Sequence, residues 1–208
     1  MRQSLLTVGL VLGLLGAPAA RGATGNDPDW PCVQRLVPVL SAGSIWSGPA
    51  LPADGSWRQE PKVAALVSAI APRAVPDAEG VRAIEGFAAP LDAEARRRLL
   101  PMAVSGTLAE TNRTRSGLIE SIRGFARRQR GLAETVRQLS EQLDAMDPEA
   151  KGEAAARREE LQQRLFFATK TFQDAERTMR YMCEAPVRLE ARFGAYARAF
   201  QAALPEAP

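Results

Sequence analysis

The stretch that decides the fold is residues 108–146, LAETNRTRSGLIESIRGFARRQRGLAETVRQLSEQLDAM. Its mostly apolar seam positions recur at alternating steps of three and four residues for more than five heptads. They are Leu108, Thr111, Arg115, Leu118, Ile122, Phe125, Gln129, Leu132, Val136, Leu139, Leu143 and Met146. This period predicts one long helix that packs lengthwise on a partner helix.

A second seam follows the polar segment 147–152, in which Asp147 and Pro148 favour the start of a new helix. Its positions are Leu161, Leu165, Ala168, Phe172, Ala175, Met179 and Met182, and then Leu189, Phe193, Tyr196 and Phe200. We therefore predict an antiparallel helical hairpin over residues 101–204, with its turn near 147–152. Pro186 should kink or break the second helix.

Arg115 interrupts the first seam, and two interpretations remain open. The seam could face solvent at this point. Alternatively, Arg115 is buried and fixes the register, paired with an acid such as Glu184. The antiparallel pairing places Arg115 near Met182.

The segments before the hairpin should form its base. Residues 61–100 show short helical periods behind the starts Pro61, Asp77 and Asp92. Residues 20–60 are rich in proline and glycine and show no helical period, which predicts an extended arm. These segments leave the hairpin near residues 130–165 uncovered, so the fold is expected to be all-α with a projecting half.

Residues 1–19 have the features of a secretory signal peptide: Arg2, an apolar run over 5–15, and Ala17 and Ala19 before the expected cleavage point. We expect an exported, periplasmic or secreted protein without a transmembrane segment or a lipid anchor. The chain has 27 basic and 24 acidic residues. Such a balanced charge argues against nucleic acid as a partner.

The chemistry of most enzymes is missing from this sequence. The chain has no histidine, which removes histidine-activated nucleophiles and histidine metal ligands. Motifs for phosphate binding, dinucleotide binding and serine hydrolysis are also lacking. We therefore expect a protein that is not an enzyme and uses no cofactor.

The chain has two cysteines, Cys32 and Cys183. In an exported protein their simplest use is a disulfide between the arm and the second long helix. The alternative is a Cu(I) site made by Met179, Met182 and Cys183, because soft sulfur ligands select this ion. Met179 and Met182 also occupy seam positions, where methionine commonly fills a core.

Two groups of residues are candidates for binding a partner. Phe166 and Phe167 flank the seam position Leu165, and a two-helix hairpin is not expected to bury both. Arg127, Arg128 and Arg130 could form a patch for an acidic partner or belong to a solvated helix face. The partner would be another periplasmic protein or a second copy of this chain.

Trp30-Pro31-Cys32 with Gln34, Arg35 and Pro38, followed by Trp46-Ser47-Gly48-Pro49, resembles the arm of uncharacterised exported helical proteins of Proteobacteria. The resemblance implies export and helices but no activity. More loosely, the hairpin looks like the coiled-coil arms of periplasmic chaperones and efflux adaptors, without their β-domains.

Two functions are consistent with these residues. The first is an adaptor or chaperone-like protein that binds its partner through the hairpin. The alternative is a module that binds a small ligand or Cu(I) at the hairpin base, with Trp30, Trp46 and Trp57 around the ligand.

Overall fold

The computed structural model describes residues 27–206, so the predicted signal peptide over 1–19 lies outside the described residues. Within this range the chain is all-helical, as predicted. The helices are α1 (Pro61–Ile70), α2 (Asp77–Ala88), α3 (Ala93–Asp144) and α4 (Glu153–Ala202), preceded by the short 3-10 helices η1 (Ala42–Ser44) and η2 (Ser56–Arg58).

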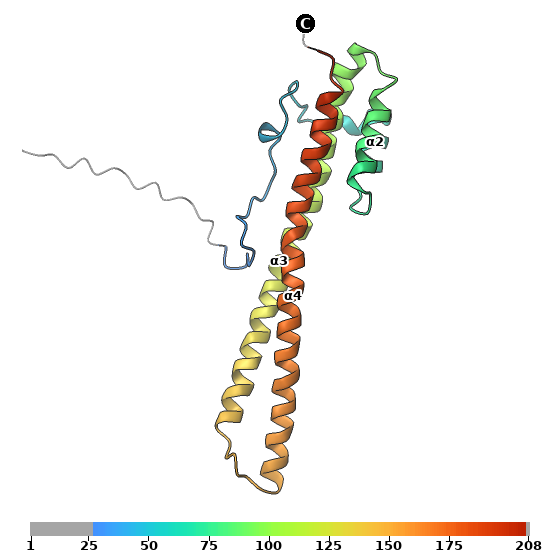
Figure 1. The fold of residues 1–208 in the computed structure, drawn as a ribbon. Coiled ribbons are helices and arrows are strands. Elements are labelled where there is room, and N and C mark those ends of the chain that lie inside the picture. Colours follow the sequence, from blue (N-terminus) through green and yellow to red (C-terminus); the bar gives the residue numbers. More distant parts are fainter. Residues whose placement is uncertain (1–26, 207–208) are drawn as a thin grey trace, which may run out of the picture.

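Helices α3 and α4 form the long antiparallel hairpin that dominates Figure 1. They have 52 and 50 residues, so each is about 75–80 Å long at 1.5 Å per residue. Every predicted seam position on both helices is buried or partly buried. The heptad pattern therefore identified the contact face over the full length of the hairpin.

The beginning of α3 differs from the prediction, which placed the hairpin boundary at residue 101. The helix starts at Ala93, where the Asp92 carboxylate accepts a hydrogen bond from the Ala95 amide at 2.8 Å. Pro101 lies inside the helix and is buried, without ending it. The third short helix of the base and the first arm of the hairpin are thus one continuous element.

Pro186 does not break α4, which continues through it to Ala202. Two side chains bind backbone carbonyls beside this proline. Gln34 Nε2 donates to the Cys183 carbonyl at 2.6 Å, and Arg115 Nη1 donates to the Pro186 carbonyl at 2.9 Å. These donors stabilise the backbone where proline lacks its own N–H and crowds the preceding turn.

Helices α1 and α2 pack against the beginning of α3 and the end of α4, and these four segments form the base. Its core joins side chains from all four helices with two tryptophans of the arm. The largest side chains with less than 2% exposure include Phe193 and Phe200 of α4 and Ile70 of α1. A Cβ at Gly80 would collide with the Tyr196 ring, so α2 can approach α4 closely only with glycine there.

The arm, residues 27–60, runs along the hairpin rather than away from it, as the blue and cyan trace in Figure 1 shows. Asn112 on α3 forms two hydrogen bonds with the backbone of Leu40, at 2.8 and 3.1 Å. Nearer the hairpin middle, Cys32 is joined by a disulfide bond to Cys183 on α4, as predicted. The arm is therefore attached along much of its length.

Candidate functional site: the distal hairpin

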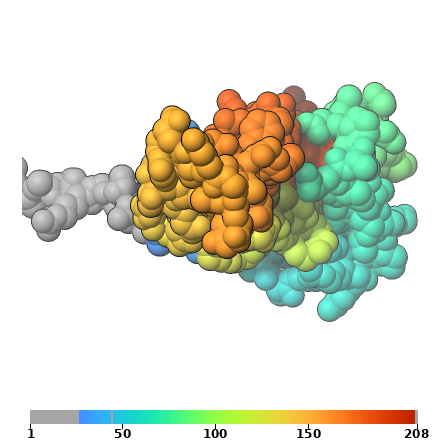
Figure 2. Space-filling view, turned by 90° about the horizontal axis from the view of Figure 1, so that it is seen from below, coloured from blue at the N-terminus to red at the C-terminus, as the bar shows by residue number. Residues whose placement is uncertain are grey.

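Residues 131–168, here called the distal hairpin, extend beyond the arm and beyond α1 and α2 (Figure 1). Viewed from its tip, this part stands in front of the other segments (Figure 2). Leu139 and Leu161, at 5% and 8% exposure, are its buried apolar side chains, and its other seam residues are only partly covered. Two helices alone cover one narrow strip of each other's surface.

Phe166 and Phe167 are the large apolar side chains exposed on the distal hairpin, at 64% and 65%. Their rings contact each other edge to face, with centroids 5.5 Å apart. The neighbouring seam residue Leu165 is partly buried, whereas its two successors are exposed. The sequence-based expectation that a two-helix hairpin leaves both rings uncovered agrees with this geometry.

The arginines predicted to bind an acidic partner are placed differently. Arg127 Nη1 lies 2.6 Å from the Asp29 carboxylate, and Arg130 pairs with the same carboxylate. These guanidinium groups hold the pKa of Asp29 below its ordinary value. The chain's own arm thus supplies the acid that Arg127 and Arg130 bind.

The same arrangement continues at neighbouring arginines on α3. Arg123 Nη2 lies 2.7 Å from the Asp27 carboxylate. The pKa of Asp27 is lowered mainly by a hydrogen bond from the Asp29 amide and then by Arg123. Arg128 instead lies over the Phe125 ring, 5.6 Å from its centroid. This part of the hairpin is an intramolecular clamp on the arm.

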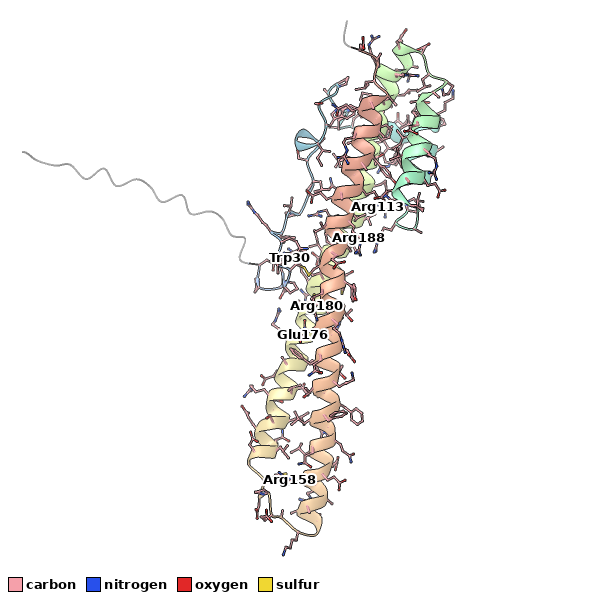
Figure 3. All side chains as sticks on the ribbon, in the orientation of Figure 1. Trp30, Arg113, Arg158, Glu176, Arg180 and Arg188 are labelled. Atoms are coloured by element: carbon pink, nitrogen blue, oxygen red, sulfur yellow. A yellow bond between two sulfur atoms is a disulfide. The ribbon has the colours of Figure 1, made fainter. Side chains whose placement is uncertain are left out.

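The structure does not bring the three predicted ligand-binding tryptophans together. Trp30 packs beside the disulfide (Figure 3), against the cluster of Ile122, Ala126 and Met179. Trp46 and Trp57 belong to the core of the base. Of the three, Trp57 lines a surface groove of about 510 Å³ between α1 and α3.

The sulfur atoms of the predicted Cu(I) site have other roles in this structure. Cys183 is bonded to Cys32, which removes the thiolate that a soft metal would require. Met179 is 7% exposed and Met182 packs against the same cluster. Within residues 27–206, no group of three or more histidine, cysteine, aspartate or glutamate residues could hold a metal ion.

Arg115 is buried at 4% exposure, which agrees with the second of its two interpretations. Its partners are backbone carbonyls rather than Glu184, which pairs with Arg188. Arg115 Nε and Nη2 donate to the Val37 carbonyl at 3.1 and 2.8 Å. Arg115 was expected near Met182, but its Nη1 donates to the Pro186 carbonyl. Arg115 therefore contacts α4 one turn further along the helix than expected. Burial lowers the pKa of this guanidinium.

Arg192 was not identified from the sequence, although it ties the loop between α1 and α2 to α4. Its guanidinium donates to the carbonyls of Ile70, Pro72 and Val75 at 2.7–3.1 Å. Its Nε also donates to Tyr196 Oη at 2.8 Å. A cation at the end of α1 interacts favourably with the helix dipole.

Below this loop the hairpin has a second surface groove of about 340 Å³. Its lining includes Leu118 of α3, Tyr181, Met182 and Arg188 of α4, and Arg73 of the α1–α2 loop. Figure 3 shows Arg188 at this level of α4, next to the end of the α1–α2 loop. The groove begins where the base ends, because within residues 27–206 no other helix covers this face of the hairpin.

No protein-family model, curated protein or solved structure matches this chain. Among the described residues, no helix is long and apolar enough to cross a membrane.

Proposed function

We propose that this is an exported, periplasmic interaction protein, adaptor-like or chaperone-like, that docks a protein partner through the distal hairpin. The observation that carries the proposal is the pair Phe166 and Phe167, adjacent on α4 and each about two thirds exposed. Adjacent exposed aromatic rings are characteristic of protein-binding surfaces.

The architecture supports this function. The base, the arm and the disulfide hold one end of α3 and α4, and this anchoring leaves the other end free to reach a partner. A disulfide that joins segments 151 residues apart is compatible with an oxidising compartment such as the periplasm. Export itself rests on the sequence of residues 1–19.

The test is capture of partners from a native periplasmic extract with the purified protein, followed by chemical cross-linking. The variant Phe166→Ser with Phe167→Ser should capture at least tenfold less partner than the wild type, because both exposed rings are removed. The matched control is Val33→Ser with Val187→Ser, which removes two exposed apolar side chains outside the distal hairpin. Equal capture by both variants would contradict the proposal.

A further inference from the structure

The exposed aromatic pair has a counterpart two heptads along α4. Arg180 and Tyr181 follow Phe166 and Phe167 by 14 residues, so the two pairs lie on the same outer face of the helix. Tyr181 is 70% exposed, and Arg180 has no hydrogen-bond or ion-pair partner within residues 27–206. The groove below the α1–α2 loop, with Arg73 on its rim, opens beside Tyr181.

The net charge of the hairpin also changes sign between its tip and its middle. Residues 131–160, which form the tip, have eight acidic and four basic side chains. Residues 27–40, 111–130 and 161–190, which form the middle, have seven acidic and twelve basic side chains. The tip is therefore negative and the middle is positive, even after the acids of the arm are included.

The spacing along α4 relates these features to one another. At 1.5 Å per residue, the Phe166–Phe167 pair lies about 20 Å from the first residue of α4, and the Arg180–Tyr181 pair lies about 40 Å from it. A two-fold axis through the phenylalanines would then bring the tip of one copy to the level of Arg180 and Tyr181 of the other. The negative tip would meet the positive middle twice, once on each side of the axis.

We propose that the protein docked on the distal hairpin is a second copy of this chain, packed antiparallel with Phe166 and Phe167 at the two-fold axis. This inference rests on the proposed function and names the partner of the same surface. The acidic tip of each copy, with Asp144, Asp147 and Glu149, lies against Arg180 and the groove below Arg73 of the other copy. A parallel arrangement is disfavoured because it would place two acidic tips side by side.

The contact is about 40 Å long and about 10 Å wide, the breadth of one helix, which gives on the order of 400 Å² per copy. This area, about 800 Å² for the two copies together, is below that of stable specific interfaces and corresponds to a weak, transient one, so the dimer is reversible and depends on concentration. Its charged contacts should also weaken as salt is raised.

Sedimentation equilibrium of the purified, oxidised protein tests the dimer over a range of concentrations at low salt. We expect dimers that dissociate on dilution and in 1 M NaCl. The variant Phe166→Ser with Phe167→Ser should weaken the association at least tenfold, with helicity and the disulfide unchanged. A monomer at every concentration would overturn the inference.

Charge reversal tests the pairing of tip and middle. Arg180→Glu and Asp147→Arg should each weaken the dimer, and the two changes in one chain should restore it, because a two-fold dimer makes each contact twice. Arg198→Glu, on the exposed face of α4 in the base, is the matched control and should have no effect. If the double variant is weaker than either single variant, the inference is wrong.

A spin label attached to Lys151→Cys distinguishes the two orientations, since the native cysteines are both in the disulfide. The antiparallel dimer places the two tip labels on the order of 40 Å apart, while a parallel dimer would bring them into close proximity. Labels in close proximity would exclude the antiparallel arrangement.

The outcomes for the two proposals differ. If the protein stays monomeric but Phe166 and Phe167 are required to capture another protein, the self-association fails and the proposed function stands. If neither association depends on these rings, both proposals fail.

Discussion

The base and the distal hairpin are made from the same two helices, but their side chains have different surroundings. In the base, α3 and α4 are covered by α1, α2 and the arm, and Phe193, Tyr196 and Phe200 are at most 2% exposed. In the distal hairpin each helix is covered only by the other, and Phe166 and Phe167 remain about two thirds exposed. The helical period is similar in both regions, so it is the number of covering layers that separates a buried core from an exposed apolar surface.

The largest expected effect comes from removing the disulfide that fixes the arm at the border of these regions. By the chain-entropy argument, Cys32→Ser with Cys183→Ser should lower the free energy of unfolding by about 4–5 kcal/mol. The arm should loosen before the hairpin melts, as seen by hydrogen exchange during urea unfolding. Reduced wild-type protein is the control and should behave like the variant. An unchanged urea midpoint would show that the arm is held by its other contacts.

A paired truncation tests the two regions directly. Phe200→Ala should cost about 3–5 kcal/mol, because it opens a cavity in the core of the base. Phe167→Ala should change stability by no more than about 0.5 kcal/mol, because its ring is already in water. Both values come from urea denaturation of dilute protein. Similar losses at the two sites would contradict the distinction between them.

Arg192→Leu should destabilise the base by about 2–3 kcal/mol, because the carbonyls of Ile70 at the end of α1 and of Val75 in the following loop lose their donor. Arg192→Lys should recover only part of this loss, because an ammonium cannot reproduce the planar set of donors. Thermal unfolding of both variants gives the comparison. Full recovery by lysine would mean that the charge alone, rather than the hydrogen bonds, stabilises the loop.

The smallest expected effect comes from protonating Asp29, the carboxylate by which Arg127 and Arg130 hold the arm. The pKa of Asp29 is lower in the folded chain, so its contribution is present above the ordinary carboxyl pKa near 3.8 and is lost as the pH falls below it. The first residues of the arm should therefore loosen progressively as the pH falls from about 3.8 through the lowered pKa of Asp29, while the disulfide keeps Cys32 in place. The indole N–H resonance of Trp30 reports this step, and Asp29→Asn should show the detached signal already at pH 7.

The heptad pattern was sufficient to predict the hairpin, because the seam from Leu108 to Phe200 is visible in the local spacing of its residues. The disulfide also followed from composition, since two cysteines allow one intramolecular pairing. The helix start at Asp92 was predicted, but its continuity with the hairpin was not: Pro101 lies inside α3 and is buried there without ending the helix.

The partners of the buried and charged side chains were harder to predict. Arg192 binds loop carbonyls more than 110 residues away, and no local pattern encodes such a contact. Likewise, Arg127 and Arg130 form a basic run in the sequence, and only the fold shows that Asp29 lies against them. Exposure of Phe166 and Phe167 was predictable because the remaining chain was too short to cover the distal hairpin.

The position of Cys183 has a consequence for local unfolding. The bridge lies 30 residues into α4, so the part of the helix before it can open while the part after it stays folded. Amide protection should therefore increase stepwise along the hairpin, with low opening free energies near the turn and values close to global unfolding beyond the bridge. A partner that binds the distal hairpin would then act on the least protected part of the molecule and would stiffen it without rearranging the base.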